Sequence, residues 1–408
     1  VGSQVMHMLT VMLVGLAMGT TVSIARAVGG RNHKQVSENV GNTVTLFFGL
    51  SIVLTVVLLL LVRPIVGVMS TPAEAVDGTV AYLTICFLGI PFITAYNIIS
   101  SIFRGMGDSK SPMYFIAIAC AANIMLDYLF IGALDFGPAG AALGTTLAQT
   151  ISVAVSLFMI LRRKNISLSK GDFHPRRPVV GQILQIGVPV ALQDGLIQIA
   201  FIVITIIANR RGLNDAAAVG IVEKIIGFVF LVPSSMLSTV SALGAQNIGA
   251  GKPERVRTGV RDATILGIAY CILMFAVLYS YGGALTSLFL DPNDLTAMSE
   301  ILPLSEQCLR VCATFYIPLL FVYLLRFTIQ GLGYSSLAVM AGVFEMVARG
   351  TFALLLVPSL GFNAVCYASP AAWIMADVFL FPAYFHCLKK QGCSFRRAPH
   401  LAAVKVEG

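Results

Sequence analysis

The chain has 408 residues, of which 57% are hydrophobic and 11% are charged, and its mean hydropathy is +0.87. A typical soluble domain has roughly 25% charged residues, so this composition excludes an ordinary soluble globular protein. The formal net charge of +8 does not indicate nucleic-acid binding, because the basic residues lie in short loops between apolar runs and form no soluble basic face.

Apolar runs that are long enough to cross a bilayer recur along the whole sequence. A transmembrane helix needs about 20 such residues, and we therefore expect an all-α polytopic membrane protein. The eleven expected spans are residues 1–28, 38–69, 78–104, 111–134, 138–162, 180–208, 216–247, 256–289, 301–330, 335–357 and 363–388.

The loops between these spans alternate in charge. One set is basic and comprises residues 26–34, 104–110, 162–177 and 251–261 and the tail from 389. The other set is acidic or neutral and comprises residues 71–77, 133–137, 290–300 and 358–363. The positive-inside rule places the basic loops and the C-terminus in the cytoplasm, as in a multi-pass protein of the inner (plasma) membrane. Arg210 and Arg211 are an exception, because their loop should face outward.

Four short segments recur in the same order at nearly constant spacing, which indicates a duplicated chain. ARAVGGRNHKQV at 25–36 resembles AQNIGAGKPERV at 245–256, and FRGMG at 103–107 resembles IQGLG at 329–333. The other two pairs are 83–91 with 309–318 and 136–144 with 361–369.

The duplication predicts two lobes. We expect an N-lobe of five helices at 1–163, a cytoplasmic linker at 164–178, a C-lobe of six helices at 179–391 and a cytoplasmic tail at 392–408. The counterpart of the span at 180–208 would lie before Val1, so we expect eleven of twelve helices here. Two six-helix lobes are related by a pseudo-twofold axis along the membrane normal. Such halves around a cavity indicate alternating access, although a channel can also be duplicated.

One apolar run contains an unpaired acid. IAIACAANIMLDYLFIGAL at 116–134 places Asn123 and Asp127 one helical turn apart. A carboxylate inside a bilayer costs roughly 2.5–3.5 kcal/mol on insertion scales, so we expect it to bind a small cation or a proton. The alternative is a permanently protonated Asp127 that packs against a neighbouring helix.

The second half contains further polar candidates. Glu345 and Arg349 are four residues apart in the matching helix, and an internal ion pair is the favoured interpretation. The other candidates for substrate contact are Gln193, Asp194, Gln198 and Glu223. Interface packing is an equal alternative for Asp194 and Glu223, and Gln193 and Gln198 give the helix of Asp194 a polar face. His7 and Asp377 are interpreted as structural, and Pro91 and Pro318 at equivalent positions are candidates for helix kinks.

Several familiar motifs are missing from the sequence. The sequence contains no GxxxxGK[ST] phosphate loop, so it does not indicate an ATP-driven pump. The five histidines are scattered and form no HExxH metalloenzyme motif. The eight cysteines contain no metal-type CxxC pair, so we interpret them as packing residues.

FRGMGDSKSPM, the NIMLD helix followed by FGPAGAALGTTLAQ, and ALGAQNIGAGKPERV together resemble the multidrug and toxic compound extrusion (MATE) transporters along essentially the whole chain. The resemblance implies twelve helices in two lobes and export of organic cations or drugs in exchange for protons or sodium ions. It also implies that Asn123, Asp127 and Thr145 bind the coupling cation, H+ or Na+. The protein would then need no cofactor, and Na+ would be the only metal ion that it binds. The chain offers no matching pair of C-lobe acids, which favours this N-lobe site.

Three alternatives remain at this stage. A flippase for lipid-linked saccharides belongs to the same superfamily, and a passive channel or a membrane-embedded enzyme would belong to a different class. As an antiporter we expect the protein to be a monomer that contacts small-molecule drugs and the lipid bilayer, and to bind no nucleic acid.

Overall fold

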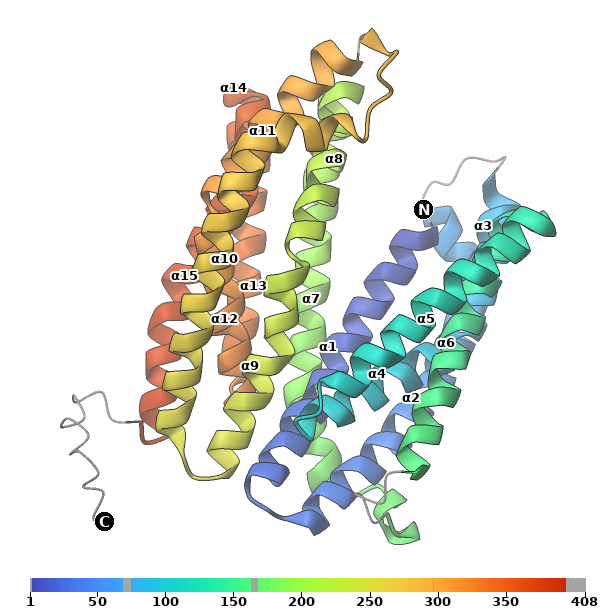
Figure 1. Cartoon of the computed structure of the whole chain (residues 1–408), viewed down its shortest axis with the longest axis vertical. Coiled ribbons are helices and arrows are strands. Elements are labelled where there is room, and N and C mark those ends of the chain that lie inside the picture. Colours follow the sequence, from blue (N-terminus) through green and yellow to red (C-terminus); the bar gives the residue numbers. More distant parts are fainter. Residues whose placement is uncertain (1, 69–74, 163–167, 296, 394–408) are drawn as a thin grey trace, which may run out of the picture.

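The computed structural model describes residues 2–68, 75–162, 168–295 and 297–393, which fold into two helical bundles that lie side by side (Figure 1). We call α1–α6 the N-lobe and α7–α15 the C-lobe. The N-lobe contains α1 (Gly2–Gly29), α2 (His33–Val68), α3 (Val76–Leu88), α4 (Ile90–Gly105), α5 (Lys110–Asp127), η2 (Tyr128–Ala133) and α6 (Gly137–Arg162).

The short helix η3 (Lys170–Phe173) precedes the C-lobe. The C-lobe contains α7 (Arg177–Arg211), α8 (Leu213–Val229), α9 (Leu231–Gly249), α10 (Pro253–Ser287), η4 (Ala297–Ile301), α11 (Leu302–Thr314), α12 (Tyr316–Gly331), α13 (Ser335–Thr351), η5 (Phe352–Leu356), α14 (Val357–Leu360) and α15 (Phe362–Lys390). Residues 164–167 of the predicted linker and 394–408 of the predicted tail lie outside the described residues.

The expectation of eleven spans is confirmed for the described part of the chain. Eight helices are individually long and apolar enough to cross a bilayer, and three bent helix pairs bring the number to eleven. The bends measure 47° between α3 and α4, 46° between α8 and α9, and 52° between α11 and α12. Pro91 and Pro318 lie just after two of these bends, as the sequence predicts, and Pro233 lies after the third, which the sequence analysis did not identify.

Helix α2 shows why these helices suit a bilayer. Phe47, Val62 and Val66 are buried against the N-lobe, whereas Phe48 and Leu60 are 65% and 76% exposed. A helix of a soluble protein would carry polar residues on that outer face. The exposed apolar face therefore fits contact with lipid chains, because an apolar side chain loses no free energy in an apolar surrounding.

The internal repeat is visible in α5 of the N-lobe and α13 of the C-lobe. Helix α5 widens from α-helical to π-helical geometry directly after Asp127, and α13 does the same directly after Thr351. π-Helical turns are uncommon and occur frequently at functional sites. The irregularity thus begins at the acid that the sequence singles out.

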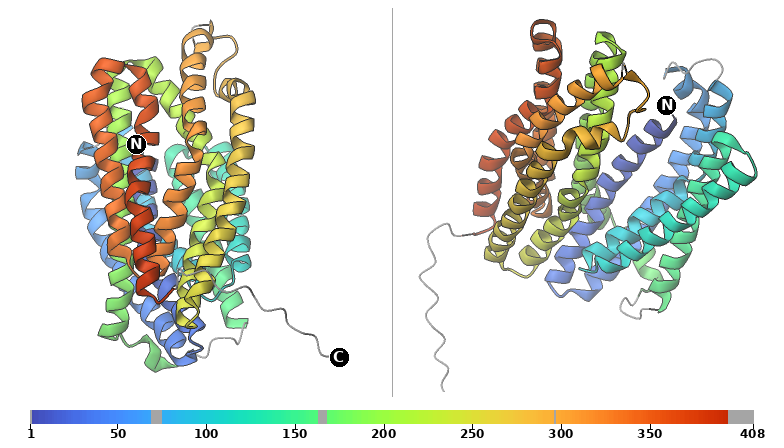
Figure 2. Two further views of the ribbon diagram at one scale, coloured as in Figure 1. Left: turned by 90° about the vertical axis from the view of Figure 1, so that its left-hand side faces the viewer. Right: turned by 45° about the horizontal axis from the view of Figure 1, so that its top comes forward.

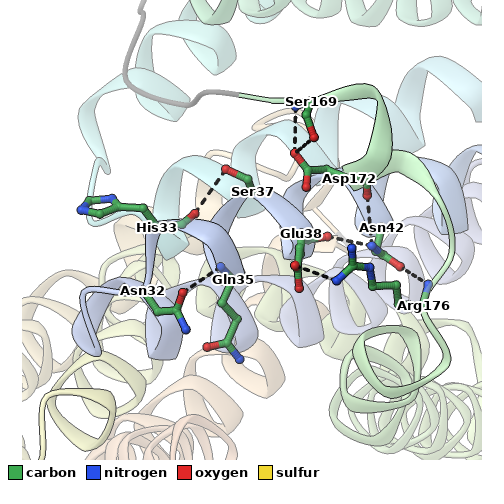
Figure 3. Close-up of polar contacts among 9 residues, drawn as sticks. All are labelled: Asn32, His33, Gln35, Ser37, Glu38, Asn42, Ser169, Asp172 and Arg176. Carbon is green, nitrogen blue, oxygen red and sulfur yellow. Dashed lines mark hydrogen bonds and ion pairs between the residues drawn. The ribbon is translucent and has the colours of Figure 1, made fainter.

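The linker between the lobes is fastened to α2 (Figure 3). Arg176 forms an ion pair with Glu38 at 2.7 Å, and the buried Asn42 donates to the carbonyl oxygen of Asp172 at 3.1 Å. The Asp172 carboxylate in turn accepts hydrogen bonds from the backbone N–H and the hydroxyl of Ser169. These contacts fix the linker against the N-lobe rather than leaving it as an extended tether.

The two lobes meet along α1, which packs against α7 and α9. They lie together at the end that carries residues 30–32, 106–109, 168–176 and 250–252, which we call the basic end (Figure 1). They diverge toward the opposite end, which carries residues 133–136 and 291–295 and which we call the acidic end. The right-hand view of Figure 2 shows the same divergence.

The charge exception at the acidic end has a local explanation. Arg211 forms an ion pair with Asp215 at 2.6 Å, and Asn214 hydrogen-bonds Glu300, so this basic side chain is neutralised. These residues line a cavity of about 530 Å³ between the α7–α8 turn and η4. The side chain of Arg210 lies outside the described residues.

Candidate functional site

The acid of the fifth helix points toward α6. Asp127 and Asn123 are both half-buried, and a methyl group placed on Gly144 of α6 would lie 2.2 Å from Asp127 Oδ1. Among the described residues, Asp127 Oδ1 and Asn123 Nδ2 are buried and have no hydrogen-bond partner. A buried polar atom without a partner costs roughly 1–3 kcal/mol. Asp127 Oδ1 therefore lacks a donor or cation, and Asn123 Nδ2 lacks an acceptor.

Thr145 follows Gly144 in α6 and faces a cavity in the N-lobe. The cavity has a volume of about 150 Å³, and its wall includes Thr145 but neither Asn123 nor Asp127. The Thr145 hydroxyl donates to the carbonyl oxygen of Ala141 in its own helix at 3.0 Å. The structure therefore brings Thr145 to the cavity and leaves the acid against the adjacent residue, Gly144.

The sequence analysis missed most of the polar residues of this cavity. Thr10, Asn97, Thr146 and Gln149 line it together with Tyr82 and Tyr96. Asn97 Nδ2 donates to the carbonyl oxygen of Ile93, and Gln149 Oε1 has no partner in the described part of the chain. The sequence signal for this cavity was the presence of polar residues within three of the apolar runs, 1–28, 78–104 and 138–162.

The predicted ion pair of the C-lobe is present and has a third member. Glu345 Oε2 accepts a hydrogen bond from Arg349 at 3.0 Å, and Glu345 Oε1 lies 3.6 Å from Arg326 of α12. The three residues are only 1–3% exposed. The sequence analysis did not include Arg326, although a lone arginine in the run YLLRFTIQG was a visible signal.

Aromatic rings complete the surroundings of the two arginines. Arg326 lies 4.7 Å from the ring centroid of Tyr323 and 5.0 Å from that of Phe327, and Arg349 lies 4.6 Å from that of Phe201. Cation–π contacts of this kind stabilise a desolvated guanidinium. The cluster Arg326–Glu345–Arg349 is therefore a buried charge centre with a net charge of +1.

Gln193 belongs to the C-lobe interior. It is fully buried, and its Oε1 accepts a hydrogen bond from Gln330 of α12 at 3.0 Å. A methyl group on Gly342 of α13 would lie 2.8 Å from the Gln193 side chain. Gln193 thus ties α7 to α12 and α13, which favours the packing interpretation for this candidate.

Asp194 and Gln198, by contrast, face the N-lobe. The Asp194 carboxylate lies against Gly15 of α1, where an added methyl group would be 2.9 Å from Oδ2. Gln198 Nε2 lies 3.4 Å from His7 Nε2, also on α1. Both candidates therefore lie where the two lobes meet, and His7 participates in the same interface.

The last two acids differ in exposure. Glu223 on α8 is exposed, as is Lys224 beside it. Asp377 on α15 is buried, and its Oδ1 has no hydrogen-bond partner within the described ranges. Glu223 therefore lies on the surface of α8, whereas Asp377 is part of the C-lobe interior.

Comparison with known proteins identifies relatives for both lobes. A family model described as MatE matches residues 1–129 and 189–355. The chain is 30% identical over 307 residues to the probable multidrug resistance protein YpnP of Bacillus subtilis, across 74% of this chain and 67% of that protein. It is 28% identical over 290 residues to the probable multidrug resistance protein YoeA of the same organism, across 69% of this chain and 62% of that protein.

The fold is also similar to solved structures. One is described as the outward-facing conformation of a multidrug resistance MATE family transporter of the MOP superfamily. It superposes with a TM-score of 0.88 at 21% sequence identity, over 94% of this chain and 86% of that one.

Proposed function

This chain belongs to the MatE family, and on that premise we propose that it is a secondary active antiporter that exports organic cations or drugs in exchange for protons or sodium ions. The family consists of transporters, so the chain is not an enzyme. The names of the relatives YpnP and YoeA support drug-like small molecules as substrates.

One observation carries the coupling part of the proposal. Asp127 and Asn123 lie a turn apart inside a membrane span, and each keeps a buried polar atom without a partner in the described structure. A proton or a sodium ion would satisfy Asp127 Oδ1, because carboxylate oxygens are suitable ligands for hard cations. The unpartnered atom of Asn123 is the amide nitrogen Nδ2, a donor, so Asn123 would bind a cation through its Oδ1 instead. In this proposal Asp127 binds and releases the coupling ion, and Asn123 and Thr145 supply neutral oxygen atoms.

Ion binding would affect the shape of the N-lobe through two features. The α5 helix changes from α to π geometry directly after Asp127, and the carboxylate touches α6 at Gly144. Neutralising the carboxylate would alter both the helix end and its contact with α6. The neighbouring cavity at Thr145 would change with them.

The charges of the C-lobe support a cationic rather than a pyrophosphate-bearing substrate. Glu223 is exposed and Asp194 lies at the lobe interface, and these positions support the proposal that both acids contact an organic cation. Arg326 and Arg349 are buried around Glu345 and are not offered to an anionic ligand. This arrangement argues against the saccharide flippase.

The test is transport by the protein in liposomes, with ethidium as the probe cation and an imposed proton or sodium gradient. The variant Asp127→Asn removes the titratable group at nearly constant volume. We expect it to reduce gradient-driven ethidium movement at least roughly tenfold, as expected when a group central to the coupled step is lost. Asp135→Asn is the matched control, because Asp135 is exposed and has φ 52°, which asparagine tolerates.

Each alternative predicts another result. Unchanged gradient-driven transport by Asp127→Asn would remove Asp127 from the mechanism. Movement of ethidium only down its own gradient, whatever the ion gradient, would indicate a passive channel instead of an antiporter. Comparison of proton with sodium gradients identifies the coupling ion.

A further inference from the structure

The internal repeat places equivalent residues in equivalent contacts. Within the N-lobe, a methyl group on Gly105 of α4 would lie 2.9 Å from the carbonyl oxygen of Thr21 on α1. Within the C-lobe, a methyl group on Gly331 of α12 would lie 2.4 Å from the carbonyl oxygen of Ser241 on α9. The sequence repeat aligns these residues with each other, so α1 and α9 are counterparts in space as well as in sequence.

These two counterpart helices cross each other at the basic end. A methyl group on Gly29 of α1 would lie 2.0 Å from the carbonyl oxygen of Gln246 on α9. Reciprocally, a methyl group on Gly249 of α9 would lie 2.1 Å from the carbonyl oxygen of Arg26 on α1. The repeat aligns Gly29 with Gly249 and Arg26 with Gln246, so the crossing is symmetric. Small residues four apart permit such close helix crossings in membranes.

The same two positions send their side chains across to the opposite lobe. Arg26 donates from Nη2 to the carbonyl oxygen of Leu332 at 3.1 Å, at the end of α12. Gln246 donates from Nε2 to the carbonyl oxygen of Gly105 at 3.0 Å, at the end of α4. Each donor therefore satisfies a carbonyl group that the helix end leaves without an intrahelical partner.

The accepting turns are also matched. Gly107 and Gly333 follow the two helix ends with φ of +86° and +90°, a conformation that favours glycine. A methyl group on Gly107 would lie 3.2 Å from Gln246 Nε2, and one on Gly333 would lie 2.7 Å from Arg26 Nη2. Glycine at both turns thus leaves room for the side chain that arrives from the other lobe.

We propose that Arg26 and Gln246 form a paired latch that holds the basic end closed and opens in each transport cycle. The proposal deepens the proposed function, since it rests on alternation between two lobe arrangements. The lobes diverge toward the acidic end, so the contacts at the basic end are the ones that hold the two lobes together (Figure 1). Both residues are positioning residues that act on the equilibrium between conformations. Loss of one hydrogen bond shifts such an equilibrium roughly five- to tenfold.

The test measures the separation of the lobes at the basic end of the full chain. Spin labels are attached at Asn32→Cys and Lys252→Cys, which lie in exposed turns of the two lobes, after the eight native cysteines are replaced. The variants Arg26→Met and Gln246→Leu remove each donor while keeping the volume nearly constant. Asn247→Leu is the matched control, because the Asn247 amide donates to Leu243 in its own helix at 2.8 Å.

We expect each latch variant to increase the population with separated labels roughly five- to tenfold and the control to change it less than about twofold. The exchanged double variant Arg26→Gln with Gln246→Arg should return the population toward that of the parent protein, since the two positions are equivalent by the repeat. Unchanged distances in both latch variants, or an equal shift in Asn247→Leu, would overturn the proposal.

A second measurement tests the latch even if the cysteine-replaced protein misfolds. Hydrogen–deuterium exchange of residues 22–32 and 242–252 is measured on chains that keep their native cysteines. The latch predicts faster exchange in both segments for either variant, whereas unchanged exchange contradicts it. A shift of the lobes without any ion-driven transport by the parent protein would refute antiport and keep the latch. Ion-driven transport by the parent protein, with no change of lobe separation in either latch variant, would refute the latch and keep antiport.

Discussion

Replacing Glu345 by glutamine should destabilise the C-lobe strongly. The variant keeps the side-chain shape but removes the carboxylate that lies between Arg326 at 3.6 Å and Arg349 at 3.0 Å. Both guanidinium groups would then lose the carboxylate that contacts them directly while they stay buried, because they are at most 3% exposed. Removing one member of a buried charge group costs roughly 3–5 kcal/mol, since the remaining charge stays desolvated.

The comparison variant is Glu306→Gln. Glu306 pairs with Arg310 at 2.5 Å on α11, but the side chains are 32% and 47% exposed, so water replaces the lost interaction. Such surface pairs contribute roughly 0.2–1 kcal/mol. In thermal unfolding of the purified protein in detergent, we expect the midpoint to fall by roughly 5 °C or more for Glu345→Gln, and by about 1 °C for Glu306→Gln.

Equal midpoints for the two variants would refute this reasoning, because they would mean that water reaches the arginines. A third variant separates loss of charge balance from loss of packing. Replacing all three members with apolar residues, as Arg326→Met, Glu345→Leu and Arg349→Met, leaves no uncompensated charge. Its stability should recover to within about 1–2 kcal/mol of the parent protein.

Two further predictions concern the acid of α5 and the linker. Gly144→Ala places a methyl group 2.2 Å from Asp127 Oδ1, so we expect roughly tenfold slower gradient-driven ethidium transport at unchanged protein yield; normal transport would show that the carboxylate is free to move. Hydrogen bonds from the backbone N–H and the hydroxyl of Ser169 hold the pKa of Asp172 below its ordinary value of 3.8. The contribution of this carboxylate to linker anchoring is therefore fully present above pH 3.8 and is lost as the pH falls through the lowered pKa. Hydrogen exchange of residues 168–176 should show protection at pH 5 that weakens below pH 3.8, and Asp172→Asn should show less protection than the parent protein at pH 5; equal protection in the variant at pH 5 would contradict this.

Much of the fold was predictable because it depends on local composition. All eleven spans follow from runs of apolar residues, and two of the three bends follow from Pro91 and Pro318. The Glu345–Arg349 pair was predictable for the same reason, since a spacing of four residues places two side chains on one helix face whatever surrounds them. The repeat was visible as recurring short segments, and its equivalent contacts appear in both lobes.

The contacts between helices were a different matter. Arg326 joins Glu345 from another helix, and the Asp127 carboxylate turns toward Gly144. Nothing in the spacing of the sequence fixes which helix faces are opposed, because that depends on the packing of all the spans together. The cavity beside Thr145 likewise combines residues from four helices.

The sequence by itself determined that this is a duplicated membrane protein with alternating basic and acidic loops, because hydropathy and charge act over about 20 neighbouring residues. Only the tertiary structure decided which residues of the two repeats contact each other at the basic end. Arg26 and Leu332 are 306 positions apart, and Gln246 and Gly105 are 141 apart, yet each pair shares a hydrogen bond. Those bonds exist because two helices with glycine at equivalent places approach closely enough for each lobe to reach the other.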